Sequence, residues 1–482
     1  MSSRPAPPAA SPASSTPLGT AGLIVLLAGQ LLPQIDFSIV NVALDAIAQT
    51  FHASATELEL IVAVYGVAFA VCLAMGGRLG DNFGRRKLFL WGVQLFGVAS
   101  LLCGFAGSIW MLLAARVLQG VGAALIVPQI LATIHVGLSG HAHSRAIGYY
   151  GAIGGLAFIV GQVFGGFLVS ADIAGLGWRS VFLINLPICI ALLFATPRWI
   201  PETRRAHKTD IDWAGTGVLA LVILCLLLPL ALGPVRHWSW PYIALLVAVL
   251  PLLAGLRRIE LNEEKRGAHP LLPPALLRLA SVRFGLLIAV LFFSCWAGFM
   301  FALALTLQSG AGLTPLQAGN AFIALGASYF VSSLTTARVA ARLGKAPTLM
   351  LGCAVQMTGL LMLMLTMKLV WPHPGVANLI PATVLIGAGQ AMIVSSFFRI
   401  GLADVPMEQA GAGSSMLSTV QQASFGLGSA LLGSVLTQTL HLGGTYLHAI
   451  VAALGAEFCI MAMLLISAVF YYRRHERQPG IR

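Results

Sequence analysis

The sequence predicts an all-α integral membrane protein. Hydrophobic residues make up 58% of the 482 residues, charged residues only 9%, and the mean hydropathy is +0.89. Soluble globular chains carry about 25% charged residues, so this composition excludes that class. Fourteen apolar segments each approach the roughly 20 residues that a helix needs to cross a bilayer.

The expected spans follow one another through the whole chain. Each is a mostly apolar run, and the least regular is the eighth, which contains Pro241 and Pro251. In order, they cover residues 18–43, 58–76, 88–108, 110–135, 147–171, 180–197, 212–233, 240–256, 284–308, 318–336, 348–370, 378–398, 411–438 and 446–472.

The basic residues set the expected orientation, because loops rich in Lys and Arg stay in the cytoplasm during insertion. With the N-terminus inside, 24 of the 28 Lys and Arg fall in tails or cytoplasmic loops. Arg116 is inside a span, and Arg179, Arg236 and Lys368 face outward. We therefore expect an even number of crossings and both termini in the cytoplasm. This asymmetry also accounts for the net charge of +12, which gives no reason to expect a nucleic-acid partner.

The tails and loops are expected to hold no soluble domain. Residues 1–17 are rich in Pro, Ala and Ser and predict a disordered cytoplasmic tail, and 473–482 form a second one. The first apolar run is too long for a signal peptide and precedes no small-residue cleavage site, so we expect it to be retained. The seven cysteines all fall inside spans without a CxxC pair, and no GxxxxGK[ST] loop occurs, so we expect no metal, disulfide or other cofactor.

A repeat divides the chain into two halves. The segment GRLGDNFGRRK (77–87) lies between spans two and three, and ARVAARLGKAP (337–347) lies between spans ten and eleven. Two pseudo-symmetric bundles with a site between them are typical of secondary transporters. We expect a six-helix bundle at 18–197, two inserted helices with a cytoplasmic connector at 198–283, and a second six-helix bundle at 284–472. At an offset of 260 residues, the aligned pairs are Arg78 with Arg338, Gly84 with Gly344, and Arg85 with Lys345.

The loop GRLGDNFGRRK resembles the signature of the major facilitator superfamily. DFSIVNVAL in span one, RVLQGVGAALIVPQ (116–129) and WRSVFLINLP (178–187) are similar to its fourteen-span drug/proton antiporter branch, and the resemblance covers nearly all of the chain after residue 18. It implies the major facilitator fold, with two six-helix bundles plus two inserted central helices, giving 14 transmembrane helices. It also implies a proton-coupled exporter of the multidrug efflux type.

The resemblance further implies that this loop is a conformational latch. In that interpretation Asp81 faces a helix N-terminus, Arg85 and Arg86 hold it, and Gly77 and Gly84 complete the signature. The plain alternative is a basic turn with helix-breaking glycines.

Two positions depart from the family pattern. Span five contains GQVFGG, with Gln162 where the antiporter signature has proline, which weakens the expectation of antiport. Gly161, Gly165 and Gly166 still allow close helix packing and a local bend. In the second loop Ala341 stands where the first has Asp81, so only the first copy can form a charged latch.

Several acids lie within or beside the spans. A carboxylate such as Asp36 costs at least about 2.5–3.5 kcal/mol at membrane depth. Arg116 of span four lies at a similar depth, so the two can pair, either as a static salt bridge or as a proton switch. Glu457 of the last span is either a second proton carrier or a carboxyl buried by packing. Thr56 and Glu59 have the spacing of a capping box, which gives Glu59 a structural role.

A polar stripe on span one predicts a face that lines a water-filled cavity. Its members fall within an arc of about 80 degrees. The aromatic run FFSCWAGFMF (292–301) suits loosely specific apolar ligands, although packing explains most of it. The stripe consists of Gln30, Gln34, Ser38, Asn41 and Asp45, and the expected substrate cavity comprises Gln34, Ser38, Asn41, Gln119 and Trp296.

These observations predict a transporter rather than an enzyme. We expect export of drugs or other small amphipathic toxic compounds by alternating access, driven by proton entry, in the inner or plasma membrane of a bacterial cell. The expected partners are a small-molecule substrate, protons and the lipid bilayer. Two alternatives stay open: an exporter dedicated to one metabolite or antibiotic, and a membrane sensor or scaffold that transports nothing.

Overall fold

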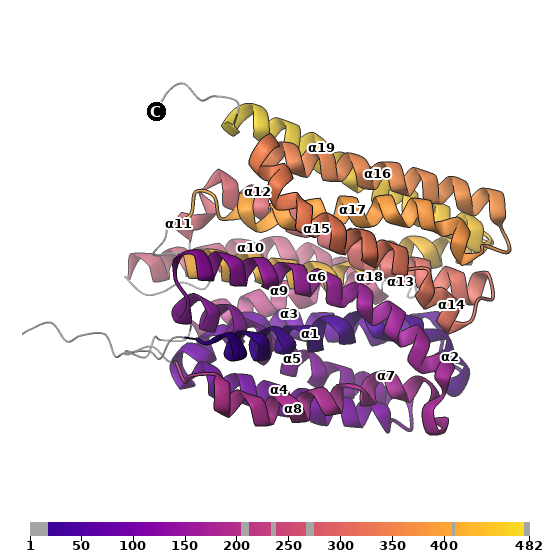
Figure 1. Ribbon diagram of the computed structural model, residues 1–482, viewed down its shortest axis with the longest axis horizontal. Helices are drawn as coiled ribbons and strands as arrows, with labels where there is room; N and C mark the ends of the chain where they lie inside the picture. Colours follow the sequence, from indigo (N-terminus) through magenta and orange to yellow (C-terminus); the bar gives the residue numbers. More distant parts are fainter. Residues whose placement is uncertain (1–17, 204–211, 233–237, 267–273, 407–409, 477–482) are drawn as a thin grey trace, which may run out of the picture.

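The computed structural model describes residues 18–203, 212–232, 238–266, 274–406 and 410–476. The regular elements in these ranges are helices, and the long ones run roughly side by side (Figure 1). The prediction of an all-α fold is thus confirmed. The expected tail at 1–17 lies outside the described residues, as does most of the second tail.

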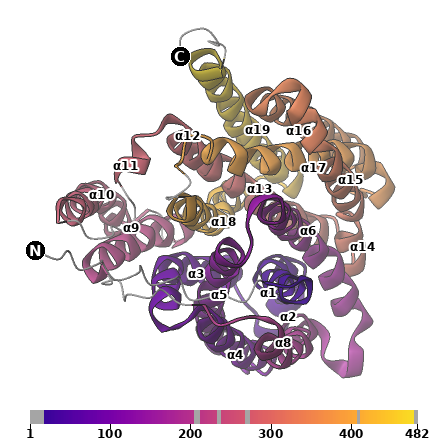
Figure 2. The ribbon, with the colours of Figure 1, turned by 60° about the vertical axis from the view of Figure 1, so that its left-hand side comes forward.

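The first bundle contains the helices up to residue 199, drawn in indigo to magenta in Figure 2. A short helical segment and a further helix, α2, extend span one, and α7 leads into α8. The elements are α1 (Thr20–Ile39), η1 (Val40–Val42), α2 (Leu44–Phe51), α3 (Ala55–Phe83), α4 (Arg85–Gly104), α5 (Ile109–Gly137), α6 (Gly140–Ala171), α7 (Ser180–Leu183) and α8 (Asn185–Trp199).

The second bundle begins at residue 280. Two wide, π-helical turns, η4 and η5, flank α13, so the first span of this bundle is helical but irregular. The elements are α12 (Ala280–Ile288), η4 (Ala289–Phe293), α13 (Ser294–Leu305), η5 (Thr306–Gly310), α14 (Pro315–Asn320), α15 (Ile323–Leu343), α16 (Lys345–Val370), α17 (Val376–Gly401), α18 (Ala410–His441) and α19 (Tyr446–Tyr471).

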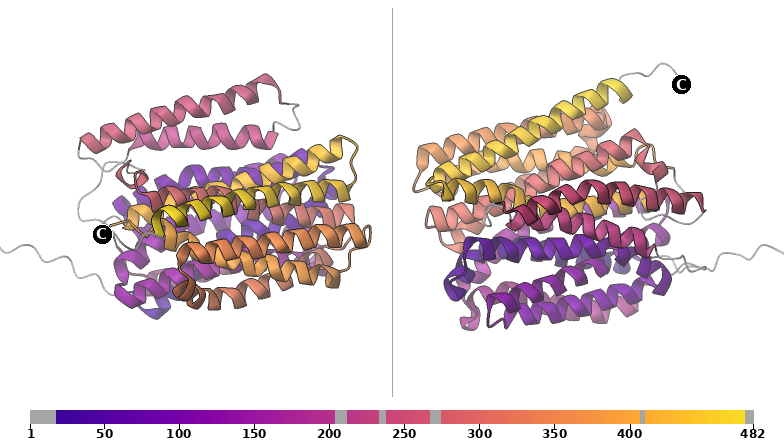
Figure 3. Two further views of the ribbon diagram at one scale, coloured as in Figure 1. Left: turned by 90° about the horizontal axis from the view of Figure 1, so that it is seen from above. Right: turned by 180° about the vertical axis from the view of Figure 1, so that it is seen from behind.

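The inserted helices α9 (Trp213–Leu232) and α10 (Trp240–Lys265) form a hairpin at the edge of the molecule (Figure 3). Helix α9 packs against α3 of the first bundle and α18 of the second, and α10 packs on α9. The outer face of α10 exposes large apolar side chains such as Trp240 and Leu250, as a helix in contact with lipid does. The short α11 (Pro274–Leu277) then leads into the second bundle.

Fewer helices in the described part of the chain are long and apolar enough to cross a membrane than the fourteen expected spans. Eleven helical stretches among the described residues are long and apolar enough to cross a membrane, and a twelfth is obtained when the bent pair Glu57–Leu73 and Met75–Phe83 is counted as one. The segments expected at 318–336 and 411–438 are helical, in α15 and α18, but do not belong to this set. The predicted count of fourteen is therefore not confirmed.

The sequence repeat corresponds to a structural one. Gly84 joins α3 to α4 with φ 106°, and Gly344 joins α15 to α16 with φ 96°. Both values lie in a region that favours glycine, which explains why the two loops share this residue.

The capping box at the start of α3 is not the expected one. Ser54 and Glu57 form it: the Ser54 hydroxyl accepts from the Glu57 N–H at 3.4 Å, and the Ser54 N–H donates to Glu57 Oε2 at 2.8 Å. The predicted box of Thr56 and Glu59 was wrong, because the N-cap is Ser54, two residues earlier. Glu59 lies two residues beyond Glu57, so its side chain is turned by about 200 degrees from that of Glu57. Glu59 instead points into the interior and is 1% exposed.

The two bundles touch at one end of the molecule and leave more space at the other. At the end that carries α2, Ser309 donates to Asp45 at 3.2 Å, and the Leu316 N–H donates to the Ser170 hydroxyl at 2.9 Å. We call this the α2 end. The opposite, basic end carries Arg85, Arg86, Arg342 and Arg399. Towards the basic end a side chain added at Gly148 or Gly151 of α6 would meet no other atom within 4 Å.

Close packing of α16 on α17 depends on glycine, and this predicts the effect of a substitution. A Cβ atom at Gly389 would lie 2.6 Å from the Gly352 carbonyl oxygen and 2.6 Å from the Gln356 nitrogen, both of which are backbone atoms. We expect Gly389→Leu to destabilise the protein by at least about 1–3 kcal/mol, because the backbone must move apart. Thermal unfolding in detergent measures the effect.

The matched control is Gly455→Leu in α19, where an added Cβ meets nothing within 4 Å. It should unfold at nearly the wild-type temperature. Equal stability of the two variants would show that the α16–α17 crossing is not tightly packed.

Candidate functional site

A buried polar cluster surrounds Asp36 in the interior of the first bundle. The Asp36 carboxylate pairs with the Arg116 guanidinium, and both side chains are fully buried. Asp36 Oδ1 also accepts from Asn185 at 2.8 Å and from Gln119 at 3.0 Å. Ser100 accepts from both of these amides, at 3.2 Å and 2.8 Å. Helices α1, α4, α5 and α8 therefore meet at one carboxylate.

Arg116 has further partners that hold it in place. Its Nε–H donates to the Ile61 carbonyl at 3.1 Å, and Nη1 donates to Gln119 Oε1 at 2.9 Å. The guanidinium lies 4.2 Å from the centre of the Tyr65 ring, a cation–π contact. The Tyr65 hydroxyl donates to the Pro33 carbonyl at 3.0 Å, which joins α3 to α1.

The chemistry of this cluster is that of a compensated charge pair. Removing one partner of a buried ion pair leaves the other charge unpaired, which costs about 3–5 kcal/mol. A proton added to Asp36 has the same effect on Arg116 without any change in sequence.

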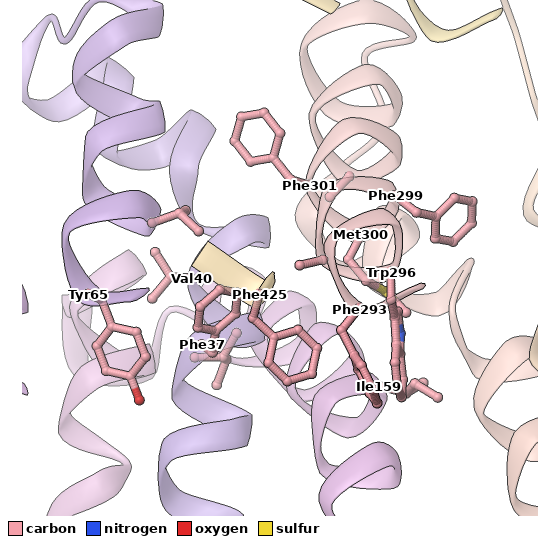
Figure 4. Packing of buried hydrophobic residues seen from close by; sticks show 14 of the residues in the cluster. Phe37, Val40, Tyr65, Ile159, Phe293, Trp296, Phe299, Met300, Phe301 and Phe425 are labelled. Atoms are coloured by element: carbon pink, nitrogen blue, oxygen red, sulfur yellow. The ribbon is translucent and has the colours of Figure 1, made fainter. Parts of the chain in front are cut away.

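Aromatic rings continue from this cluster across the seam between the bundles (Figure 4). The Tyr65 ring contacts Phe37 at 5.7 Å between centroids, and Phe37 contacts Phe425 of α18 at 5.8 Å. Phe425 in turn lies 5.3 Å from Phe293 and 6.2 Å from Trp296. The ion pair of the first bundle is thus in contact, through three rings, with the aromatic wall of the second.

A cavity lies between the two bundles beside these rings. The space between its lining atoms, including the part that opens to solvent, is about 440 Å³, of which only about 20 Å³ is open to the centre of a water-sized sphere. Helices α1, α6, α17 and α18 and the η4–α13 turn contribute its walls, so both bundles form it. The side chains that line it include Gln30, Gln34, Tyr150, Phe293, Trp296, Phe398, Gln421, Gln422 and Phe425.

Only two of the five residues expected in the substrate cavity line it, namely Gln34 and Trp296. Gln119 belongs to the Asp36 cluster, since it lies one turn from Arg116 on the same face of α5. Ser38 donates to the Ile35 carbonyl at 3.1 Å and packs on α6, and Asn41 is 1% exposed. Both lie towards the α2 end, where contact between the bundles covers that half of the polar stripe.

The loop from α3 to α4 is held inside the first bundle. Arg85 forms a salt bridge with Asp81, with Nη2 2.6 Å from Oδ1. Arg86 was expected to hold Asp81 but instead pairs with Glu202. Glu202 Oε1 also accepts from the Arg86 N–H at 3.1 Å. Glu202 therefore occupies the N-terminus of α4, the position assigned to Asp81.

Gly77 and Gly84 lie on either side of Asp81 in this loop region. Gly77 lies inside α3, and an added Cβ would meet only Pro128, at 3.6 Å. Gly84 has the positive φ described above, and its Cβ would lie 2.7 Å from Glu202 Oε1. Glycine is therefore required at residue 84 more strictly than at residue 77.

The glycines of span five let α6 approach other helices closely. Added Cβ atoms at Gly161 and Gly165 would lie 2.7 Å and 2.8 Å from carbonyl oxygens of α1. Gly166 instead faces Gly319 of the second bundle, where a Cβ would lie 3.1 Å from its Cα. Gln162, which replaces the expected proline, is fully buried, and α6 continues through it as one helix.

Glu457 lies away from both the cavity and the Asp36 cluster. Its carboxyl is buried between α16 and α19 and accepts from Gln356 at 3.0 Å. No group of three or more His, Cys, Asp or Glu side chains in the described ranges could hold a metal ion.

Other residues of the site were not predicted. Asn185, Glu202 and Phe425 act through contacts more than a hundred residues away in sequence, which no local pattern reveals. Gln30 was named in the stripe but not in the cavity that it lines. Glu59 lies at the seam beside Gly433 and Thr437 of α18.

The chain matches the family model described as Major Facilitator Superfamily over residues 26–429. It is 35% identical to a protein named "Probable actinorhodin transporter" from Streptomyces coelicolor, over 84% of this chain and 70% of that protein. It is 30% identical to "Drug efflux pump JefA" from Mycobacterium tuberculosis, over 80% of this chain and 74% of the relative.

Solved structures with a similar fold include transporters of other substrates. The xylose transporter XylE from E. coli, in a partially occluded inward-open conformation, superposes with a TM-score of 0.59 at 12% identity, over 95% of this chain and 99% of that one. A POT family transporter in complex with 5-aminolevulinic acid gives 0.66 at 12% identity, over 94% and 98%. At this identity the likeness concerns the fold alone. The two bundles, the repeated glycine loop and the family match together show that this chain belongs to the major facilitator superfamily.

Proposed function

We propose that this protein is a proton-coupled secondary transporter that exports drugs or other small amphipathic toxic compounds by alternating access. The observation that carries the proposal is the cavity, because its walls come from both bundles and a buried ion pair adjoins it through Tyr65 and Phe37. A site between two bundles can be opened to either side when the bundles rock.

The arrangement of the bundles supports alternating access. Contacts between Ser309 and Asp45 and between Leu316 and Ser170 close the α2 end. The excess of Lys and Arg at the basic end assigns that end to the cytoplasm. Both termini then lie in the cytoplasm, and the protein resides in the inner or plasma membrane of a bacterial cell. In this state the cavity is closed on the outside.

Proton coupling would use Asp36 and Arg116. When Asp36 takes a proton, Arg116 loses its countercharge and keeps only neutral partners, among them the Ile61 carbonyl and the Tyr65 ring. A shift of Arg116 moves Tyr65 and Phe37, which contact the seam at Phe425. A proton that enters down a potential of 100 mV supplies about 2.3 kcal/mol for this change. Glu457 is a second candidate for carrying a proton.

The Asp81–Arg86 loop would act as a latch through the first bundle. It ties α3 and α4 to the segment after α8, since Arg85 and Arg86 bind Asp81 and Glu202. We expect these ties to form in only one of the two arrangements of the bundles, which would favour that arrangement. The glycines at 161, 165 and 166 allow α6 to slide closely past α1 and α14.

Relatives suggest two degrees of substrate breadth. "Drug efflux pump JefA" is named for drugs in general, whereas "Tetracenomycin C resistance and export protein" from Streptomyces glaucescens is named for one compound. Export dedicated to a single metabolite or antibiotic is therefore the second candidate function. Growth inhibition by a panel of unrelated toxic compounds, in an efflux-deficient host with and without the protein, separates the two. Protection against none of them, with no transport in proteoliposomes under an imposed pH gradient, would favour a sensor or scaffold instead.

Asp36→Asn should abolish proton-driven export while leaving substrate binding within about threefold of wild type. The amide cannot exchange a proton, yet it keeps the shape of the group that Asn185 and Gln119 contact, and it lies outside the cavity. Substrate-induced proton release from the purified protein and export by proteoliposomes measure the two effects. Arg116→Ala should unfold at a lower temperature than wild type, because it leaves a buried carboxylate without its countercharge.

Glu457→Gln is the matched control for this test, since it removes a buried carboxyl from the second bundle. If Asp36→Asn retains full proton release and export while Glu457→Gln loses them, the coupling site is Glu457 and the Asp36–Arg116 pair is structural.

Arg85→Ala should slow transport at least about fivefold while leaving substrate affinity nearly unchanged, because it shifts the balance between arrangements and lies far from the cavity. Lys87→Ala is the control, since Lys87 lies on the same turn of α4 but contacts only the Trp91 ring among the interactions described. Initial export rates and equilibrium binding in detergent give the two quantities. A loss of affinity as large as the loss of rate would contradict a latch.

A further inference from the structure

The cavity between the bundles has polar walls but no charged ones. Its lining contains no Asp, Glu, Lys, Arg or His side chain among the residues that the structure describes. Four glutamines, one serine and one tyrosine supply its polar groups. A permanent cation that entered would lose its hydration without gaining a countercharge, which is costly in a site shielded from water.

The three buried acids of the two bundles, among the residues that the structure describes, are not available to such a cation. Asp36 is on the far side of α1 from Gln34 and is already paired with Arg116. Glu457 faces Gln356 inside the second bundle. Glu59 lies beside Thr437, twelve residues along α18 from Phe425, or about 18 Å at the helical rise.

The aromatic wall does not replace the missing acid. Cations bind aromatic cages through the open faces of the rings. Here Phe293 stacks on Trp296 at 6.0 Å, and Phe425 packs against both. Phe293 and Trp296 are at most 1% exposed, so their faces cover one another. The wall therefore offers ring edges rather than open ring faces.

Two buried polar atoms in the lining are free to form hydrogen bonds with a ligand. Gln30 Oε1 and Ser418 Oγ are buried and have no hydrogen-bond partner, and Gln30 is 3% exposed. Buried acceptors without partners are rare in native proteins, and a donor on a ligand would satisfy them. The neighbouring Gln34 and Gln422 add both donors and acceptors.

The glycines of α6 shape the opposite wall. Gly151 and Gly154 line the cavity, and a Cβ at Gly154 would already lie 3.2 Å from Gln30 Nε2. A side chain at residue 154 would therefore crowd Gln30, so glycine there leaves the Gln30 amide accessible from the cavity.

We propose, building on the transport function above, that the cavity selects uncharged, flat aromatic compounds that carry carbonyl and N–H or O–H groups, and discriminates against permanent cations. The glutamine amides and the Ser418 hydroxyl bind the polar edge of the ligand, and the Phe293–Trp296–Phe425 wall packs on its rings. Gln422 is the specificity-determining residue on α18, and Gln34 has the same role on α1.

Two probes of the same shape test the proposal. Acridone is an uncharged three-ring compound with a carbonyl and an N–H, and N-methylacridinium has the same rings with a fixed positive charge. Equilibrium binding of both to the full-length protein in lipid nanodiscs is measured from probe fluorescence. We expect the wild type to bind acridone at least tenfold more tightly than N-methylacridinium.

Gln422→Glu should reverse this preference, lowering the ratio of affinities at least tenfold, because it adds a carboxylate without changing the size of the side chain. Gln34→Glu should act in the same direction from the other bundle. Gln438→Glu is the control, since it lies on α18 but is exposed and outside the cavity. Gel filtration and thermal unfolding show whether each variant is folded.

Equal or tighter binding of N-methylacridinium to the wild type would overturn the proposal, as would binding of neither probe. An unchanged ratio in both folded Glu variants would also overturn it. Because binding needs no gradient, a preference for acridone without export in proteoliposomes would contradict the proposed transport function alone. Export of both probes at equal rates and affinities would contradict only the selectivity.

Discussion

The first bundle is organised around one constraint, the need to keep two opposite charges together away from water. Asp36 and Arg116 are tolerated because the carboxylate and most of the guanidinium have hydrogen-bond partners, several of them on other helices. Asn185, Gln119 and Ser100 therefore fix how α8, α5 and α4 stand relative to α1. An apolar pair would pack equally well but would not fix one arrangement, nor could it respond to a proton.

The ion pair is linked to the interface between the bundles through Tyr65, which contacts both Arg116 and the ring of Phe37. Its ring holds the guanidinium and touches Phe37, and its hydroxyl binds the α1 backbone at Pro33. Phe37 is then the last side chain of the first bundle before Phe425 of the second. Because only Tyr65 and Phe37 lie between the ion pair and Phe425, a rearrangement of the pair would reach the interface between the bundles without a long chain of intermediate contacts.

The sequence predicted the elements whose geometry is regular. The depths of Asp36 and Arg116 follow from a fixed rise per residue, and the two structures of the loop repeat follow from glycines at 84 and 344. It failed where a choice depends on packing between helices. Ser38 and Gln34 share one stripe, yet of the two only Gln34 meets the cavity, because Ser38 packs against Gly161 of α6. Gln119 could have been placed correctly, since a residue three positions from Arg116 shares its face. The partners of Arg86 and Asp36 at Glu202 and Asn185 lie too far along the chain for any local signal.

The hairpin α9–α10 makes the transporter asymmetric within the plane of the bilayer. Because α9 packs on both α3 and α18, it lies over the line along which those helices meet. A compound dissolved in the lipid cannot slip sideways between the bundles on that flank without displacing a helix. Lateral entry is left to the other flank, where α6 meets α15 and α17, and where small residues such as Gly151 and Gly154 border the cavity. Access to the cavity from the lipid would therefore differ between the two flanks of the molecule.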